Sequence, residues 1–464
     1  MQSKTLYTPE NVSAHFVGVG GAGMSALANI LLARGASVSG SDLKDSKYVR
    51  ALREQGATVY VGHQASHITE PDVVVVSTAI PETNPEVAEA RRRGIEVWPR
   101  AQMLAFLAGQ RKTVAVAGTH GKTSTSSMIA TMLRSMGEQP SFCIGGVVDG
   151  VNANAENGSG ELYVVEADES DGSFVFLEPH IAVITNMEPD HLDHYADFDE
   201  IKDVFVDFMQ RTHEDGAIVI CGDDTDLVET AQRVTNRTIV SYGKGENCTY
   251  QYRIVGRSGI GTKFELYKEG KRIALSTCAV PGEHMVSNAT AALVCADVLG
   301  LSVEKAAEGL ATFSGVRRRF DLVKEINGVT IVDDYGHHPT EINATLSAAS
   351  SLDFERVVVA FQPHRYTRVQ NLVREFGNAF NEADRVIILD VYSAGEAPIP
   401  GVSGRSIVES ILEQHPRAQV AFMPHRQEVA SYLKTVVRPG DILLTMGAGD
   451  VTTVGPEVAR ELRK

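Results

Sequence analysis

Residues 111–124 read RKTVAVAGTHGKTS, and this stretch decides the fold class of the chain. The apolar run KTVAVA is typical of a buried strand, and it leads directly into a glycine loop. After the loop we expect a helix that begins at Lys122. A glycine loop between a strand and a helix presents backbone N–H groups to phosphate oxygens, so the stretch predicts an α/β domain with a phosphate site.

The loop departs from the general P-loop pattern in one respect. GxxxxGKT expects its first glycine at position 116, where this chain has Val116. The chemistry of the loop survives this change, because Lys122 can still reach a transferred phosphate and the Thr123 hydroxyl can still ligate magnesium. The ATP-binding residues predicted here are Gly118, Thr119, His120, Gly121, Lys122, Thr123 and Ser124.

Two acidic clusters follow apolar strands in the same region. ELYVVEADESD places Glu166, Asp168, Glu169 and Asp171 after one strand, and IAVITNMEPDHLDH (residues 181–194) places Asn186, Glu188, Asp190, His191, Asp193 and His194 after another. A single acid at a strand end is usually no more than a solvated side chain. Two clusters beside one phosphate loop favour a magnesium site, since magnesium prefers hard oxygen ligands.

A second glycine loop lies near the N-terminus. Residues 18–23 read GVGGAG after a predicted strand, and Asp42 ends the next strand, which matches GxGxxG and its ribose-binding acid. By itself this loop indicates NAD or another diphosphate ligand, or a purely structural tight turn. Two phosphate loops in separate domains argue against simple hydride transfer, which needs one nucleotide, and suggest ATP with a second phosphorylated substrate.

The alternation of short apolar runs and helical patterns predicts a mostly parallel α/β fold in three domains. We place them at residues 1–110, 111–314 and 315–464, the first and last being Rossmann-like and the central one a P-loop domain. Between about 238 and 280, the segments TIVSYG, TYQYRIVG, GTKFELYKE and KRIALSTCAV resemble antiparallel strands, so we expect a small β insertion in the central domain.

Composition narrows the function. The 464 residues carry a net charge of -16, which disfavours a nucleic-acid or membrane-surface binder. Five scattered cysteines form no CxxC pair and suggest neither a disulfide framework nor a zinc site. No stretch reaches the roughly 18 apolar residues of a spanning helix, and the N-terminus lacks an apolar signal region. We expect a cytoplasmic enzyme without membrane insertion, as a monomer or weak homodimer.

Eight ordered motifs together resemble the cytoplasmic Mur ligases: GVGGAGMS, AGTHGKTSTS, EADESD, TNMEPDHLDHY, GVRRRF, DDYGHHPTE, FQPHRYTR and VYSAGEAPIPG. The resemblance covers about residues 13 to 450. It implies three domains that bind a UDP-sugar, ATP and an amino acid in turn, and an amide bond formed through an acyl phosphate with magnesium. The third-domain motifs favour L-alanine and UDP-N-acetylmuramate as substrates over attachment of a whole tripeptide to the same sugar. A Rossmann dehydrogenase is the alternative from another class.

The resemblance also implies roles for particular residues. Lys122, Glu166, His191 and Arg319 would be catalytic, and Thr123, Glu166 and His191 would ligate metal. The UDP-sugar would contact Gly18, Gly20, Gly21, Gly23, Asp42, His63 and Ser77. His284, Asn288 and Asp334 would join the ATP site, and Tyr335, His337, His364, Arg365 and Arg368 would form the amino-acid side.

Two positions depart from the family pattern. Met285 stands where the family usually has asparagine near adenine, and a thioether offers no amide donor. Phe205 and Val206 stand where sister ligases carry a carbamylated lysine, although Lys202 is close in sequence. We therefore expect activity that does not depend on CO₂.

Arginine and histidine residues in the third domain suit amino-acid capture. Arg365 and Arg368 are three positions apart at a predicted helix start, where both would face one side and clamp a carboxylate. His337, His338 and His364 follow other strands of that domain, and histidines titrate near neutral pH. One of them is therefore a candidate acceptor for the proton of the attacking amine.

Overall fold

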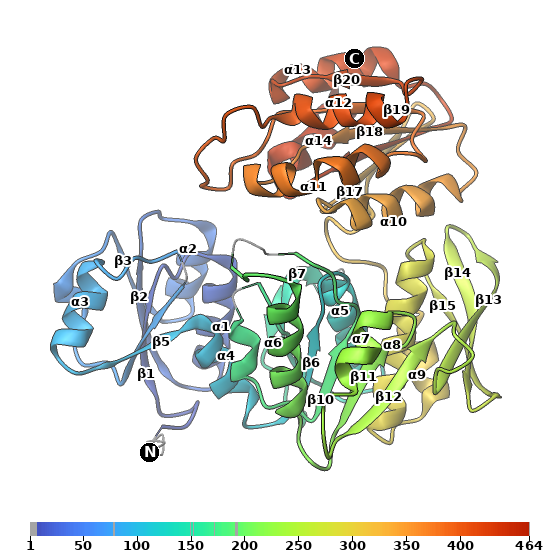
Figure 1. The fold of residues 1–464 in the computed structure, drawn as a ribbon. Helices are drawn as coiled ribbons and strands as arrows, with labels where there is room; N and C mark the ends of the chain where they lie inside the picture. Colours follow the sequence, from blue (N-terminus) through green and yellow to red (C-terminus); the bar gives the residue numbers. More distant parts are fainter. Residues whose placement is uncertain are drawn as a thin grey trace. The chain divides into compact units, whose positions relative to one another are not determined.

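The computed structural model describes residues 7–77, 79–148, 150–151, 153–170, 172–190 and 194–463. Three sheets, each flanked by helices, form a mixed α/β structure, which confirms the predicted fold class (Figure 1). The chain divides into two compact units. The first comprises residues 1–251, 267–274 and 290–312, and the second comprises residues 252–266, 275–289 and 313–464. Among the residues that the structure describes, no helix has the length and apolar character of a membrane span.

The N-terminal sheet has the strand order β3-β2-β1-β4-β5, and all its pairings are parallel. The chain adds β2 and β3 on one side of β1 and then β4 and β5 on the other side, so the strand order reverses between β1 and β4. Doubly wound sheets bind nucleotides at such a switch point. The loops after these two strands hold Gly18 and Ser77. The elements are β1 (Ser13–Val17), α1 (Ala22–Ala33), β2 (Ser37–Asp42), α2 (Lys47–Glu54), β3 (Thr58–Val61), η1 (Ala65–His67), β4 (Val73–Val76), α3 (Pro85–Arg92), β5 (Glu96–Pro99) and α4 (Arg100–Ala108).

The central sheet places β6 between β9 and β10, and it pairs in parallel with both. The phosphate loop after β6 therefore lies at the same sheet edge as the polar residues that end β9 and follow β10. Helix α5 begins at Lys122, as the sequence predicts. The elements are β6 (Lys112–Ala117), α5 (Lys122–Ser135), β7 (Ser141–Val148), β8 (Ala153–Glu156), β9 (Leu162–Glu166), η2 (Ser173–Phe176), β10 (Ile181–Ile184), α6 (Phe198–Gln210), β11 (Ala217–Cys221) and α7 (Thr225–Ala231).

The segment from 238 to 280 corrects one expectation. Its first strand, β12 (Thr238–Gly243), pairs in parallel with β11 and so extends the main sheet instead of opening an antiparallel insertion. The glycine turn that follows had suggested a hairpin, but strand direction is set by the pairing partner, which local sequence does not specify. The sheet order continues through three further strands, and two helices follow them: β13 (Tyr250–Ser258), β14 (Gly261–Lys268), β15 (Lys271–Cys278), α8 (Glu283–Val298) and α9 (Val303–Leu310).

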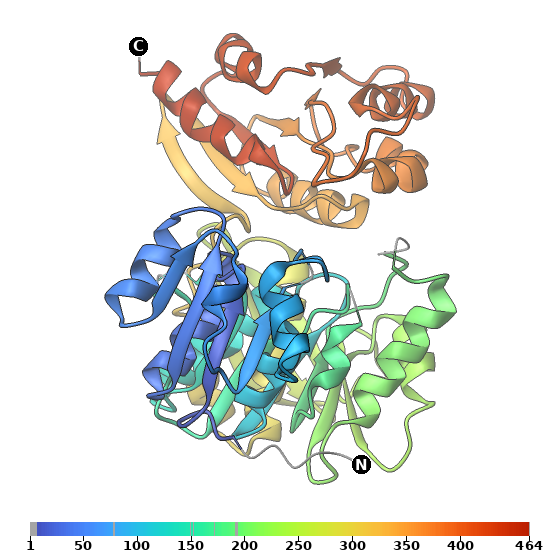
Figure 2. The ribbon, with the colours of Figure 1, turned by 90° about the vertical axis from the view of Figure 1, so that its left-hand side faces the viewer.

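The C-terminal sheet has the order β16-β17-β21-β18-β19-β20, with only β16 antiparallel to its neighbour. Helices cover both faces of this sheet (Figure 2). Alternate residues of β18 enter two cores: Val357 and Val359 pack with α10, α11 and α12, while Val358 packs with α13 and α14. The elements are β16 (Asp321–Ile326), β17 (Val329–Asp334), α10 (Pro339–Ser350), β18 (Arg356–Phe361), α11 (Tyr366–Asn378), β19 (Arg385–Ile388), α12 (Gly404–Gln414), β20 (Val420–Phe422), α13 (Arg426–Val436), β21 (Asp441–Met446), η3 (Asp450–Thr453) and α14 (Val454–Glu461).

Candidate functional site

The phosphate loop, residues 118–123, connects β6 to α5 and depends on two glycines. Gly118 has a φ of +127° and Gly121 a φ of +83°, values that other residues rarely adopt. A Cβ on Gly118 would lie 2.2 Å from the hydroxyl oxygen of Thr185. Gly121 is the N-cap of α5 and supplies no side-chain cap, so the first N–H groups of the helix face the loop as phosphate donors.

Lys122 is largely shielded from solvent in this loop, with 14% of its side chain exposed, and three oxygens hold it. Its ammonium lies 2.7 Å from Glu169 Oε1 and donates to the carbonyls of Gly118 at 2.6 Å and Thr119 at 3.2 Å. Burial alone would lower the pKa of Lys122, but the carboxylates of Glu169 and Asp168 outweigh it and raise the pKa. Burial raises the pKa of Glu169 to about 7, against the opposing influence of Lys122. The lysine therefore carries its charge at neutral pH.

Glu166 ends β9 and lies directly beside the loop. The Thr123 hydroxyl donates to Glu166 Oε1 at 3.0 Å, and the N–H of Gly145 donates to Oε2 at 2.7 Å. A hydroxyl and a carboxylate side by side are the hard oxygen donors that magnesium takes from a protein, so these two residues fit a magnesium ion. His191, predicted as a further metal ligand, lies outside the described residues.

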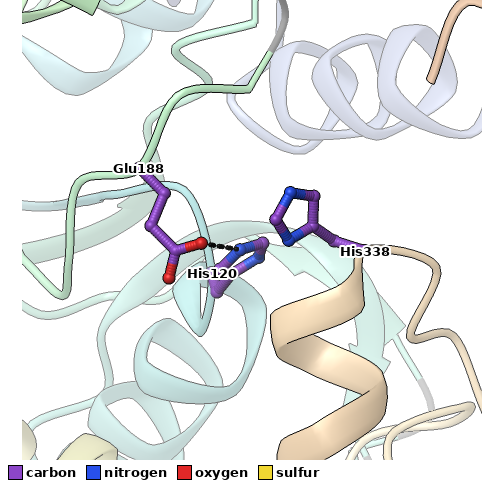
Figure 3. Close-up of side chains that lie close together, drawn as sticks. All are labelled: His120, Glu188 and His338. Carbon is purple, nitrogen blue, oxygen red and sulfur yellow. Dashed lines mark ion pairs between the residues drawn. The ribbon is translucent and has the colours of Figure 1, made fainter. Parts of the chain in front are cut away.

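The end of β10 braces the tip of the loop. The N–H of His120 donates to Asn186 Oδ1 at 2.8 Å, and the Asn186 amide donates back to the His120 carbonyl at 2.9 Å. The Thr185 hydroxyl donates to the same carbonyl at 2.5 Å. The His120 ring forms an ion pair with Glu188 at 3.5 Å, drawn as a dashed line in Figure 3. These contacts hold the tip of the loop against the end of β10.

The N-terminal glycine loop has the same kind of construction. Gly18 has a φ of +82°, and the N–H of Gly20 donates to Asp42 Oδ2 at 2.9 Å. A Cβ on Gly20 would lie 2.8 Å from the Asp42 carboxylate, so this close approach requires glycine. Helix α1 begins after Gly21 without a side-chain cap, which suits a diphosphate. A Cβ placed on Gly18 would lie 3.7 Å from Ser77 Oγ. Gly18 and Ser77, which are both predicted to bind the UDP-sugar, therefore lie close together.

In the second unit, Arg319, Asp334 and Tyr335 lie close together. The Arg319 guanidinium lies 5.1 Å from the centre of the Tyr335 ring, and Arg318 lies 4.8 Å from it. Asp334 accepts a hydrogen bond from the N–H of Phe320 at 2.8 Å. Burial raises the pKa of Asp334 to about 6, although Arg319 opposes that rise. The group thus combines two guanidinium groups, an aromatic ring and a buried carboxyl, and Asp333 and Glu341 pair with the two arginines.

His337, His364 and Arg368 form a second cluster in this unit. The two imidazole rings lie 5.5 Å apart, and Arg368 contacts His364 Nδ1 at 3.4 Å. Burial, together with the nearby guanidinium of Arg368, lowers the pKa of His337 to about 3, against the opposing influence of Glu341, and that of His364 to about 4. The expectation that these two histidines titrate near neutral pH is therefore wrong, because burial beside a cation disfavours their charged form. They are neutral hydrogen-bonding groups and poor proton acceptors.

Arg365 and Arg368 differ in setting more than the sequence suggests. Arg365 precedes α11 as its N-cap, with a φ of +68°, and its N–H donates to the carbonyl of Tyr392 at 2.9 Å. A non-glycine residue in this region is strained, and such strain tends to occur at functional positions. Arg368 lies in the first turn of the helix and is buried.

His284, Met285 and Asn288 lie at the start of α8. The Asn288 amide contacts the Met285 sulfur at 3.8 Å, a weak interaction, and both side chains are buried. His284 is exposed at the start of the helix. Met285 thus takes up one of the contacts of Asn288.

Two carboxylates organise these sites and were not among the predicted site residues. Glu169 holds Lys122, and Glu341 accepts from the N–H of His337 at 3.0 Å and from Arg319 at 3.4 Å. Both occur inside motifs that the sequence analysis quotes, EADESD and DDYGHHPTE. The acidic cluster after β9 already included Glu169, and Glu341 lies at the third position of α10, where it completes a capping box. Their contacts to Lys122 and Arg319 had no local signal, because those residues are distant in the chain.

Three family models match the chain in order. They are the Mur ligase family catalytic domain at residues 13–112, the Mur ligase middle domain at 116–296, and the Mur ligase glutamate ligase domain at 318–449. The last of these begins just before Arg319 and ends at Gly449, so the models together span each cluster of side chains described above.

Individual relatives match over almost the whole chain. A UDP-N-acetylmuramate–L-alanine ligase of Geobacter sp. (strain M21) is 46% identical over 450 residues, covering 97% of each chain. A ligase of the same name from Myxococcus xanthus is 44% identical over 456 residues, covering 98% of this chain and 96% of the relative. The crystal structure of a UDP-N-acetylmuramate–alanine ligase from Thermotoga maritima has a TM-score of 0.79 at 30% identity, covering 97% of this chain and 99% of that one.

Proposed function

The chain belongs to the Mur ligase family, and on this premise we propose that it joins L-alanine to the carboxylate of UDP-N-acetylmuramate with hydrolysis of ATP. The near-full-length likeness to relatives of that name carries the proposal. The product, UDP-N-acetylmuramoyl-L-alanine, is a precursor of peptidoglycan. ATP and UDP-sugars are cytoplasmic metabolites, so the enzyme would act in the cytoplasm.

Activation of the sugar carboxylate is the first chemical step. A carboxylate oxygen attacks the γ-phosphorus of ATP, and the bond from that phosphorus to the β-γ bridging oxygen breaks, giving an acyl phosphate and ADP. Lys122 supplies a buried positive charge at the phosphate loop, where negative charge develops during transfer. Loop N–H groups at the start of α5 bind the phosphate oxygens.

Amide formation is the second step. The alanine amine attacks the acyl carbon, and the tetrahedral intermediate expels inorganic phosphate. Arg365 and Arg368 would bind the alanine carboxylate, because a guanidinium binds a carboxylate through two parallel hydrogen bonds. The neutral rings of His337 and His364 would line this site as hydrogen-bonding groups.

Magnesium fits beside the phosphate loop. Thr123 and Glu166 would hold it, with His191 as a further ligand. When bound, the ion neutralises charge on the ATP phosphates. The N-terminal glycine loop, with Asp42, His63 and Ser77, would hold the UDP part of the sugar substrate.

A coupled assay of ADP release tests the proposal. ADP should form only when UDP-N-acetylmuramate and L-alanine are both present, and mass spectrometry should detect UDP-N-acetylmuramoyl-L-alanine. Release that requires a tripeptide in place of alanine would identify the alternative ligase of the same family. Turnover of a nicotinamide cofactor without ADP release would contradict the ligase assignment and support a dehydrogenase.

A further inference from the structure

Glu86 is a fully buried carboxylate on α3 whose surroundings none of the motifs explains. It accepts hydrogen bonds from four groups around the N-terminal sheet: the Ser41 hydroxyl at 2.5 Å, His67 Nδ1 at 2.7 Å, the N–H of Gln64 at 3.2 Å and His15 Nε2 at 3.4 Å. A fifth group, His63 Nδ1, lies 3.5 Å from the carboxylate. A buried carboxylate is tolerated only with such a set of donors.

Glu86 is ionised throughout the physiological range. Burial by itself would raise the pKa of Glu86, but hydrogen bonds from His15, Ser41 and His67 lower it to about 2. An ionised carboxylate only accepts hydrogen bonds, so each group that touches it must donate. The Ser41 hydroxyl has one proton, and at 2.5 Å that proton points to Glu86.

The orientation of Ser41 determines the proton position on His63. His63 Nδ1 lies 2.8 Å from Ser41 Oγ, whose only proton is already donated to Glu86. The hydroxyl oxygen must therefore accept from His63, and the nearby Glu86 oxygen is also an acceptor. Both neighbours of Nδ1 require a proton on that nitrogen.

We propose that Glu86, acting through Ser41, is a positioning residue that holds His63 as the Nδ1–H tautomer and so presents a bare Nε2 to the uridine of the substrate. Within the described residues, His63 Nε2 has no hydrogen-bond partner, and 12% of the side chain is exposed. A bare imidazole nitrogen accepts a hydrogen bond from an N–H or O–H group. Uracil N3–H and the ribose hydroxyls are the donors that a uridine nucleotide offers.

The location of the relay supports this role. Ser41 and Asp42 are neighbours on β2, and Asp42 is the residue that binds the N-terminal glycine loop through Gly20. Glu86 and Ser41 are 45 residues apart in the chain. His63 lies in the loop after β3, the strand that pairs with β2. The relay therefore lies beside the loop assigned to the diphosphate, where the nucleoside of a UDP-sugar must extend. The inference deepens the proposed function and rests on it for the identity of the nucleotide.

The tautomer is measured directly on the full-length protein. ¹⁵N-histidine labelling and two-bond ¹H–¹⁵N correlation spectra at about pH 8 distinguish the tautomers, since these differ in which nitrogen carries the proton. The His63→Gln variant identifies the His63 signals. We expect the Nδ1–H form in the wild-type protein. An Nε2–H form or a doubly protonated ring would overturn the inference, and neither outcome depends on a Glu86 variant being able to fold.

The consequence for binding is measured with UDP itself by calorimetry. In Glu86→Gln the amide can donate to Ser41, which turns the hydroxyl proton toward His63 and moves the imidazole proton to Nε2. We expect UDP affinity to fall by at least about tenfold, with the His63 tautomer changed. Glu82→Gln is the matched control, because Glu82 pairs with Arg91 at the surface, and it should bind UDP as the wild type does. Unchanged UDP affinity in a folded Glu86→Gln protein would overturn the inference.

Two further measurements distinguish a specific effect of Glu86 on the orientation of His63 from a general loss of structure in the variant. The KM for UDP-N-acetylmuramate should rise in Glu86→Gln while the KM for ATP and the kcat at saturation stay near the wild-type values. Two analogues identify the group that donates to His63: 3-methyl-UDP lacks the uracil N3–H, and 2′-deoxy-UDP lacks the ribose 2′-hydroxyl. The analogue that lacks the true donor should bind weakly to the wild type, and its affinity should fall little further in Glu86→Gln. A wild-type protein that fails to bind UDP would contradict the proposed function, while the tautomer measurement would remain interpretable.

Discussion

The ammonium of Lys122 lies 2.7 Å from Glu169 Oε1, and the carbonyl of Gly118 accepts from the same nitrogen. Lys122 begins α5, whereas Glu169 follows β9, so the pair joins the two strands that meet at the phosphate loop. A phosphate that enters the loop must compete with Glu169 for this ammonium. The position of the Lys122 ammonium therefore affects the pKa of Glu169.

Replacing Lys122 by alanine should reduce kcat by roughly 10² to 10³, because the transferred phosphate loses its buried cation. UDP binding should remain near the wild-type value, since the UDP-sugar is assigned to the other glycine loop. Calorimetry with UDP and a steady-state assay measure the two effects. Lys112→Ala, at the exposed start of β6, the strand that precedes the loop, is the control and should retain activity. A large loss of UDP affinity in Lys122→Ala would mean that both loops share one ligand.

Binding of ATP should take up a proton near neutral pH. Burial raises the pKa of Glu169 to about 7, and the nearby ammonium of Lys122 opposes this rise. When Lys122 turns to a phosphate, that opposition weakens, so the pKa of Glu169 rises further and the carboxylate binds a proton. At about pH 7.5 the carboxylate is mostly ionised beforehand, so the sign is uptake.

Calorimetry in two buffers of different ionisation enthalpy measures this proton. The apparent binding enthalpy should differ between the buffers for the wild type and should differ much less for Glu169→Gln. Equal enthalpies for the wild-type protein would show that Glu169 keeps its protonation state when ATP binds.

Replacing Arg365 or Arg368 by lysine should weaken alanine capture. A lysine cannot reproduce the two parallel hydrogen bonds of a guanidinium, so the KM for alanine should rise by an equivalent of about 1 to 3 kcal/mol. The KM for ATP should change little. Arg374→Lys, an exposed position on the same helix, is the matched control. A rise in the KM for ATP or for the UDP-sugar with that for alanine unchanged would assign these arginines to the nucleotides.

Activity should not depend on dissolved CO₂. Phe205 is buried against Phe174, where sister ligases carry their carbamylated lysine, and Lys202 donates to Asp226 at 2.6 Å. An ammonium engaged in an ion pair is a poor nucleophile toward CO₂. The rate in degassed, bicarbonate-free buffer should equal the rate in ordinary buffer. Recovery of a depressed rate on adding bicarbonate would show that a lysine is carbamylated, and Lys202→Arg would then identify it.

The positions of the two glycine loops could be predicted, and their ligands stay predictions. Each lies between an apolar run and a helical pattern, and the positive φ of Gly18 and Gly118 is a local demand that only glycine meets cheaply. The sequence also predicted strands before the motifs DDYGHHPTE and FQPHRYTR of the third domain, and β17 and β18 lie there. Burial could not be predicted from these patterns, and it makes His337 and His364 poor proton acceptors, although one of the histidines of this domain was expected to accept the proton of the amine.

The sequence by itself determined the α/β fold, the phosphate loop with Lys122 and Thr123, and the family, because these depend on residues that are close in the chain. Only the tertiary structure decided that β12 runs parallel to β11, and that Glu86 meets Ser41. The physical reason is that strand direction and side-chain convergence depend on which strands lie side by side. The order β3-β2-β1-β4-β5 arises when the whole sheet buries its apolar faces, and no local spacing in the chain encodes it.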